Sequence, residues 1–330
     1  MNVLITGGAG FIGSNLVDLY LARGHKVHAI DDLSTGFGAN LSQAMKNPNF
    51  KFDHQDIVTW QGLERAVQRA DVVFHMAAVV GVKRVLEDSL NVIKTNCGGT
   101  ERVLEAAAKL KWKPRVIIAS SSEVYGFNAK PSFAESDDLV LRSNDHFRWC
   151  YTATKLMDEF MAQAYFMERD VPVTSVRLFN TVGPRQAGAY GMVVPNFVRQ
   201  AVSGRSITVF GDGNQTRSFC DVRDMVQLLS LLAQNEKTAG KILNAGNDRE
   251  ISILDLAKLV KKISESTSNI KFIEYAEAYG RPFKDVDHRR PDLTELRKWI
   301  SFTNKWKLED TLEDLVALET KKQQVRIPAE

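Results

Sequence analysis

The stretch ASSSEVYG, residues 119–126, carries three hydroxyls and a carboxylate at the point where an aliphatic run ends. Hydroxyl groups at such a point can satisfy backbone groups of a turn. The carboxylate needs more explanation, because an ionised glutamate is rarely placed at the mouth of a core without a partner. Glu123, with Ser121 and Ser122 beside it, is therefore a candidate for chemistry at the end of a buried strand.

A tyrosine and a lysine four residues apart, Tyr151 and Lys155 in YTATK, form a second candidate. This spacing places both side chains on one face of a helix. A phenol has a pKa of about 10, so it acts as a base near neutrality only when cations lie close to it. Lys155 and an oxidised nicotinamide ring could supply that field. Any helix can carry this spacing without a function, so its weight comes from the motifs around it.

Three glycines in the turn GGAGFIG, Gly7, Gly10 and Gly13, lie between an aliphatic run and a helical pattern. Glycine there allows positive φ, close approach of the backbone to a pyrophosphate, and packing of the helix on the sheet. The helix N-terminus adds free N–H groups and a positive dipole end. Asp31 ends the second aliphatic run, where an acid accepts hydrogen bonds from ribose hydroxyls and repels a 2′-phosphate. The pattern predicts a site that selects NAD over NADP. The alternative is a tight turn without a ligand, and Asp32 could equally be a solvated turn residue.

Short aliphatic runs alternate with amphipathic segments in the first half of the chain. Strands are expected at 3–6, 26–30, 50–52, 71–76, 115–120 and 173–179, and helices at 15–23, 100–110 and 151–165. Such alternation predicts an α/β fold with a Rossmann-type, doubly wound parallel sheet covered on both faces. The pattern loosens after about residue 180. We therefore expect an NAD-binding Rossmann domain over 1–178 and a smaller, interleaved C-terminal α/β substrate domain over 179–330.

Two capping-box patterns predict where helices begin in the second half. Ser252 with Asp255 opens ILDLAKLVKKI, and Asp310 with Glu313 opens TLEDLVALE. The polar tail from Thr320 is expected to be frayed.

Composition excludes several classes of protein. The 330 residues are 44% hydrophobic and 25% charged, with a formal net charge of +3 and no basic block, which gives no support for nucleic-acid binding. No apolar run approaches a membrane span, and no secretory signal is visible. Three widely spaced cysteines form neither a disulfide framework nor a metal site. A reduced, cytoplasmic enzyme without a metal is the expectation.

These motifs together resemble the extended short-chain dehydrogenase/reductases that modify nucleotide sugars, and they are closest to the UDP-glucuronate decarboxylases. The similarity covers nearly the whole chain and rests on GGAGFIG, DDLSTG, QDI, HMAA, KTNCGGT, SSSEVYG, YTATK, RLFNTVGPR, QTRSF and HRRPD. The resemblance implies that NAD stays bound through the catalytic cycle and that the C-terminal domain closes over a sugar nucleotide, with a UDP-sugar favoured. It also implies that Ser121 hydrogen-bonds the sugar hydroxyl and completes a trio with Tyr151 and Lys155.

The resemblance also assigns binding residues. Besides the glycines, Asp31, Tyr151 and Lys155, the positions that match the family's cofactor contacts are Phe11, Ile12, Asp32, Ser34, Asp56, Ile57, Ala77, Ala78, Lys83 and Asn96. The positions that match contacts to the nucleotide diphosphate are Asn180, Arg199, Arg217 and Arg289, and Arg185 is a further candidate for substrate binding. Arginine forks suit phosphate oxygens, and asparagine offers both a donor and an acceptor. Each arginine taken singly could be a surface charge.

Residues around Glu123 bear on the reaction. The 4-epimerases resemble S-x-[ST]-VYG at this point, whereas glucose-type 4,6-dehydratases carry an Asp–Glu pair, and Ser122 lies where that Asp would be. A [ST]-S-E-VYG pattern resembles UDP-glucuronate decarboxylases and also occurs in GDP-mannose 4,6-dehydratases. FRWCYTATK and AYGRPFKDVDHRRPD look like segments of the decarboxylase that initiates aminoarabinose synthesis, in which Arg289 and Phe283 match an Arg and a Tyr at the sugar carboxylate.

The sequence therefore favours oxidation of a C4 hydroxyl followed by decarboxylation of UDP-glucuronate. A C4 ketone makes the C6 carboxylate a β-keto acid, and Glu123 with Ser122 could orient that carboxylate or handle the proton at C5. The alternatives for the reaction are a 4-epimerase, then a 4,6-dehydratase. A separate alternative for Glu123 is that it only shapes the pocket through an ion pair to Arg289 or another arginine. A non-enzymatic NAD-binding scaffold is a further alternative, although such proteins typically lose the tyrosine or the lysine. The family also implies a homodimer formed by helices at about 86–109 and 151–168.

Overall fold

The computed structural model describes residues 1–81, 85, 87–141, 149–188, 192–275, 277 and 286–326. Its centre is a seven-stranded sheet in the order β11-β6-β5-β4-β1-β2-β3, with every neighbouring pair parallel. The strands are β1 Asn2–Thr6, β2 Lys26–Asp31, β3 Phe50–His54, β4 Val72–His75, β5 Arg115–Ser121, β6 Val173–Leu178 and β11 Ile242–Ala245. Chain order reverses at β1, which sends successive crossovers to opposite faces.

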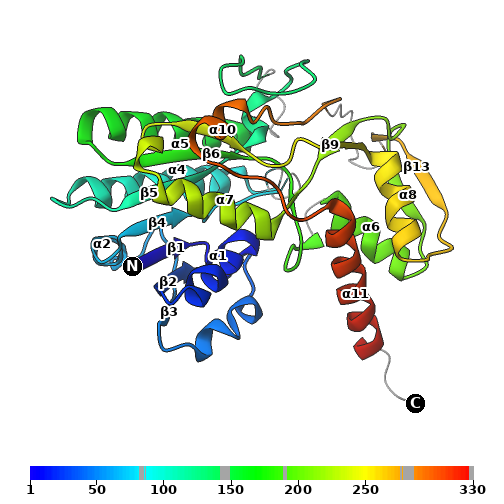
Figure 1. Ribbon diagram of the computed structural model, residues 1–330, viewed down its shortest axis with the longest axis horizontal. Coiled ribbons are helices and arrows are strands. Elements are labelled where there is room, and N and C mark those ends of the chain that lie inside the picture. The colour runs from blue at the N-terminus through cyan, green and yellow to red at the C-terminus, as the bar shows by residue number, and fades with distance from the viewer. Residues whose placement is uncertain are drawn as a thin grey trace.

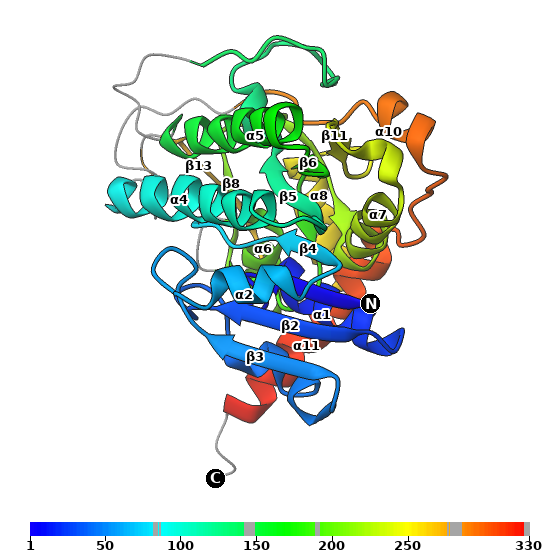
Figure 2. The same ribbon diagram turned by 90° about the vertical axis from the view of Figure 1, so that its left-hand side faces the viewer.

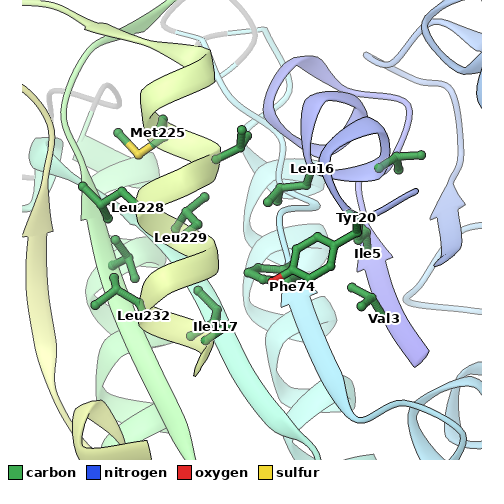
Figure 3. Close-up of a cluster of buried hydrophobic side chains, with 14 of the residues drawn as sticks. Val3, Ile5, Leu16, Tyr20, Phe74, Ile117, Met225, Leu228, Leu229 and Leu232 are labelled. Carbon is green, nitrogen blue, oxygen red and sulfur yellow. The ribbon is translucent and has the colours of Figure 1, made fainter. Parts of the chain in front are cut away.

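Helices cover both faces of the sheet (Figures 1 and 2). On one face lie α1 Phe11–Ala22 and α7 Val222–Gln234, and on the other lie α2 Leu63–Gln68, α4 Ser89–Ala108 and α5 Trp149–Arg169. Figure 3 shows the apolar core between the sheet and the helices α1 and α7. Tyr20 and Leu16 of α1 and Leu229 of α7 pack there over Phe74 and Ile117 of the sheet. The predicted doubly wound α/β fold is confirmed.

The seventh strand was not predicted. β11 comes from far along the chain and pairs with β6, so that Leu243 lies beside Val176. α7, which also follows residue 180, packs against α1. The segment ILNA is too short for its periodicity to separate a buried strand from a loop. Its place is set by the completely buried Leu243 and Ala245, which extend the core of the sheet.

A smaller unit lies beside the sheet, at the right of Figure 1. It contains α6 Val193–Val202, α8 Ile253–Ile263 and α11 Leu308–Arg326, with β8 Ile207–Phe210 paired in parallel to β13 Ile270–Ile273. Phe197, Val209, Leu256 and Leu312 form the centre of its apolar core. The remaining elements are α10 Thr294–Trp299 and the short pairs β7 Thr181–Val182 with β10 Cys220–Asp221, and β9 Thr216–Ser218 with β12 Glu250–Ser252.

The structure confirms one predicted helix start and corrects the other. Ser252 caps α8, where its hydroxyl accepts a hydrogen bond from the Asp255 backbone N–H at 3.0 Å. Asp310 does not cap α11, because that helix begins earlier, at Leu308, and Asp310 accepts from the Lys307 backbone N–H at 3.0 Å. The frayed tail predicted from Thr320 is wrong as far as Arg326, where α11 ends, and residues 327–330 lie outside the described residues.

Candidate functional site

A cavity of about 730 Å³ opens at the carboxyl ends of the parallel strands and is closed on its far side by the smaller unit. Each strand of the sheet from β1 to β6 is followed by a segment that lines this cavity. Ligands of open parallel sheets bind at this edge, at the point where the strand order reverses. The sheet therefore brings together segments that lie far apart in the sequence.

The glycine turn after β1 has no room for side chains. Gly7 has φ +69°, and a Cβ on it would lie 2.7 Å from the Ala77 backbone nitrogen. A Cβ on Gly13 would lie 2.1 Å from the Gly7 carbonyl oxygen. α1 begins directly after Gly10, so the N–H groups of its first turn have no partner within the helix. This bare backbone at a helix N-terminus fits a dinucleotide pyrophosphate.

Asp31 at the end of β2 is 7% exposed and is fixed by the backbone. Its carboxylate accepts hydrogen bonds from Ala9 N–H at 2.9 Å and Leu33 N–H at 2.8 Å. Burial raises the pKa of Asp31, and these backbone donors oppose the rise. Each oxygen keeps acceptor capacity for a ribose hydroxyl. Asp32, in contrast, is exposed and bonds the backbone and hydroxyl of Ser34, as a turn residue does.

We expect Asp31→Ser to weaken NAD binding roughly ten- to a hundredfold, as loss of a hydrogen bond to a charged group does. NADP should be affected less, because the charge that repels its 2′-phosphate is removed along with the bonds. Isothermal titration of apoprotein with each dinucleotide measures the ratio, and Asp32→Ser is the control with the smaller expected effect. Equal affinity of the unmodified protein for NAD and NADP would show that Asp31 does not select the cofactor.

Ser121, Tyr151 and Lys155 converge on the cavity from β5 and α5. Burial raises the pKa of Tyr151, while the Lys155 ammonium and a hydrogen bond with Ser121 act in the opposite direction. The Lys155 side chain is almost fully buried and contacts Asp158, one turn further along α5, at 3.0 Å. A serine hydroxyl, a phenol and an ammonium thus meet where a substrate hydroxyl could be deprotonated.

A buried ion pair holds α5 in register with the strands below it. Glu159 accepts from Arg177 of β6 through two bonds, at 2.9 and 2.8 Å, and from the hydroxyl of Ser120 of β5 at 2.5 Å. Bidentate pairs of this kind fix geometry as well as charge. Because Ser120 precedes Ser121 in the strand, this contact sets the distance between the serine and the tyrosine on the helix.

Glu123 forms an ion pair with Arg289, with 2.5 Å between Oε1 and Nη1. The two side chains are 24% and 12% exposed, and both line the cavity. Ser121 lies at the same place, since its hydroxyl accepts from the Glu123 backbone N–H at 3.2 Å. A carboxylate and a guanidinium are therefore positioned beside the Ser121–Tyr151–Lys155 trio, although 166 residues separate them in the sequence.

Most of the predicted site residues line this one cavity. They are Gly7, Gly10, Phe11, Ile12, Gly13, Asp31, Asp32, Ser34, Asp56, Ile57, Ala77, Ala78, Ser121, Ser122, Glu123, Tyr151, Lys155, Asn180, Arg217 and Arg289. Lys83 and Phe283 lie outside the described residues.

Three predicted contacts do not line the cavity. Asn96 is buried, and its amide exchanges hydrogen bonds with the backbone of Val79, at 2.8 and 3.3 Å, so it holds a segment of the cavity wall. Arg185 pairs with Asp18 of α1 at 2.6 Å, and the exposed Arg199 donates to Asn196 at 2.6 Å.

Sequence reasoning missed Asp158 and the wall formed by the smaller unit. Gln200, Thr208, Phe210, Gln215 and Tyr275 line the cavity from that unit. Asp158 could have been noticed, because a spacing of three from Lys155 places it on the same helix face.

Within the described residues no helix combines the length and apolar character needed to cross a membrane, and no His, Cys, Asp or Glu cluster there could hold a metal ion.

Comparison with known proteins agrees with this geometry. Residues 3–246 match the NAD dependent epimerase/dehydratase family. A UDP-N-acetyl-alpha-D-glucosaminuronate decarboxylase of Bacillus cytotoxicus is 38% identical over 300 residues, 91% of each chain. A UDP-glucuronic acid decarboxylase of Danio rerio is 33% identical over 94% of this chain and 70% of its own. The structure of a UDP-glucuronic acid 4-epimerase of Bacillus cereus, with UDP-glucuronic acid and NAD, has a TM-score of 0.86 at 27% identity and covers 98% of this chain and 100% of the epimerase.

Proposed function

Because the chain belongs to the NAD-dependent epimerase/dehydratase family, we propose that it oxidises the C4 hydroxyl of UDP-glucuronate, or of its 2-acetamido counterpart, and then releases the C6 carboxylate as carbon dioxide. The observation that carries this proposal is the Glu123–Arg289 pair beside the Ser121–Tyr151–Lys155 trio. An arginine at this position can bind the sugar carboxylate, and two relatives that match over more than nine tenths of the chain are decarboxylases.

The chain's own residues supply positioning and acid–base chemistry. Tyr151, as a phenolate, takes the proton of the C4 hydroxyl, Ser121 hydrogen-bonds the same oxygen, and the Lys155 ammonium stabilises the phenolate. The glycine turn and Asp31 would hold NAD, which would supply the acceptor for the hydride from C4. Asn180 and Arg217 hold the diphosphate.

Decarboxylation follows from the ketone that this oxidation creates. The bond from C5 to the carboxylate breaks, and its electrons move onto the C4 oxygen, where Ser121 and protonated Tyr151 donate hydrogen bonds. Arg289 orients the carboxylate against the ring. Glu123 draws Arg289 into place and, as an anion close to the substrate carboxylate, favours departure of neutral carbon dioxide. The product of this step is protonated at C5, with Glu123 or Ser122 controlling delivery of that proton.

A 4-epimerase is the second candidate, favoured by the structural similarity to epimerases. An epimerase needs only that the ketone rotate before the hydride returns, so it gives Glu123 no chemical role. A 4,6-dehydratase needs an acid where this chain has Ser122, a buried hydroxyl.

A panel of nucleotide sugars tests the proposal. Purified protein is incubated separately with UDP-glucuronate, its 2-acetamido counterpart, UDP-glucose and GDP-mannose, and the products are identified by mass spectrometry. We expect loss of carbon dioxide from one or both of the carboxylate-bearing substrates and no conversion of GDP-mannose. Conversion of UDP-glucose alone, to an isomer, would favour the epimerase.

We also propose a homodimer formed by α4 and α5, which lie side by side in Figure 2. Apolar side chains on these helices are exposed to solvent, namely Leu90, Ile93, Met157, Phe160 and Met167. Phe160 is 69% exposed, and apolar surface concentrated on two neighbouring helices is typical of an interface. The second copy would bury this surface in a four-helix bundle.

We expect Phe160→Glu to convert the dimer to a monomer at micromolar concentration, since it places a charge at the centre of the apolar surface. Multi-angle light scattering measures the mass. Phe272→Glu, which changes an exposed phenylalanine of β13, is the matched control and should stay dimeric. A monomeric unmodified protein would contradict the dimer.

The three cysteines, Cys97, Cys150 and Cys220, are free thiols. Unpaired thiols suit a reducing compartment, and we propose a cytoplasmic location on this basis.

A further inference from the structure

Lys155 and Asp158 form an ion pair inside the protein, next to the proposed base. Their side chains are 2% and 0% exposed, and Nζ lies 3.0 Å from Oδ2. Lys155 has three N–H donors, so this contact leaves two for Tyr151 and a cofactor ribose. The Thr100 hydroxyl of α4 also interacts with this carboxylate, and together with Lys155 it opposes the rise that burial causes in the pKa of Asp158. Burying a carboxylate is costly even when it is paired, so the position calls for a reason.

The groups around Lys155 explain why a carboxylate is needed. Burial lowers the pKa of Lys155, but Asp158 and Tyr151 more than offset that effect, and the net shift is upward. From α4, Cys97 faces the ammonium as a neutral thiol, because burial raises its pKa to about 11. From β4, His75 is also neutral, since burial lowers its pKa to about 3.

Further carboxylates lie near this group of residues, among them Glu101 of α4, which acts on Cys97. Glu159, beside Asp158 on α5, is occupied by Arg177 and Ser120. Glu123 acts on Tyr151 from the end of β5 and raises its pKa, but it is paired with Arg289. The carboxylate that contacts Lys155 is Asp158.

We propose that Asp158 is a positioning residue, which keeps Lys155 charged in a site that would otherwise favour the neutral amine and which aims the ammonium at Tyr151. An oxidised nicotinamide bound in the cavity that Lys155 lines would add a second positive charge near this ammonium. The Asp158 carboxylate, on the same helix as Lys155, would offset that charge. The inference depends on the role proposed for Lys155 and holds for whichever sugar is oxidised.

The titration of Lys155 itself tests this inference without a substrate. Protein containing lysine isotopically labelled at Cε is titrated by nuclear magnetic resonance, and the Lys155 signal is assigned by its loss in Lys155→Met. In the unmodified protein we expect Lys155 to stay protonated to at least the pH at which surface lysines titrate. In Asp158→Asn its titration should move down by roughly 1 to 3 pH units, the size of shift that an adjacent opposite charge produces.

Asp221→Asn is the matched control, because it removes a buried carboxylate that pairs with Arg223 and does not line the cavity. It should lower the melting temperature and leave the Lys155 titration unchanged. The oxidation rate gives an independent readout. In Asp158→Asn its alkaline limit should move down in pH with the Lys155 titration, whereas a merely structural role would lower the rate equally at every pH.

Two results would overturn the inference. One is a Lys155 titration in Asp158→Asn that matches the unmodified protein. The other, which does not need a folded variant, is a Lys155 in the unmodified protein that titrates well below surface lysines, since Asp158 would then fail to hold its charge.

Discussion

Replacing Tyr151 with phenylalanine is expected to lower turnover at least about a hundredfold, within the range of roughly 10²–10⁴ that general-base catalysis contributes. The change removes one oxygen at the edge of the cavity and leaves the glycine turn and Asp31 untouched, so cofactor affinity and folding should be retained. Steady-state kinetics, with a cofactor titration and a melting curve, separate these effects. Tyr165→Phe removes the same oxygen from the same helix outside the cavity and should turn over like the unmodified protein.

The pH dependence has a defined sign. Tyr151 acts as a base only when deprotonated, and burial raises its pKa while Lys155 lowers it. The oxidation rate should therefore rise with pH until the pKa of Tyr151 is passed. Unmodified turnover by Tyr151→Phe would rule out this residue as the base.

Replacing Glu123 with glutamine should separate the two halves of the reaction. Glutamine keeps the size and much of the hydrogen bonding of glutamate but removes its charge, so the cavity should survive. Given UDP-glucuronate in a single turnover, the variant should still accumulate the absorbance of reduced cofactor. Release of carbon dioxide should slow by about 10²-fold or more, because the anion that acts after oxidation is gone.

Arg289→Gln is the companion variant, since it breaks the same ion pair from the other side. If Glu123 only shapes the pocket, the two variants should behave alike, with weaker substrate binding and with oxidation and decarboxylation falling together. If Glu123 acts on the carboxylate, Arg289→Gln should lose binding while Glu123→Gln retains it.

The Rossmann half of the site could be predicted because its signals are local. The glycine turn and Asp31 lie within 25 residues of one another. The turn joins β1 to α1 and Asp31 ends β2, so a neighbouring element positions each of them. The proximity of Tyr151 and Lys155 was equally predictable, because the period of a helix alone places the two side chains together.

Other features depend on contacts that no local pattern encodes. β11 was missed because its pairing with β6 is decided by burial across the sheet. The start of α11 was misplaced because Asp310 is the third residue of the helix, where its carboxylate accepts from the Lys307 N–H as the second partner of a capping box does, and it does not precede the helix. Asp158 was missed because its importance depends on the burial of the Lys155 ammonium that it contacts, and the spacing of the two residues does not reveal burial.

The pairing of Glu123 with Arg289 was foreseen only through motif resemblance. The contact joins the end of β5 to a segment 166 residues later, so the fold of the smaller unit decides it.

The most direct measurement follows the carboxylate carbon of the substrate. UDP-glucuronate, or its 2-acetamido counterpart, isotopically labelled at C6 is incubated with the unmodified protein, and both gas and nucleotide sugar are analysed over time. The proposed function predicts that label appears as carbon dioxide in step with consumption of one of these substrates. Conversion of the labelled sugars to C4 epimers that retain the label, with no labelled carbon dioxide, would contradict decarboxylation and leave an epimerase.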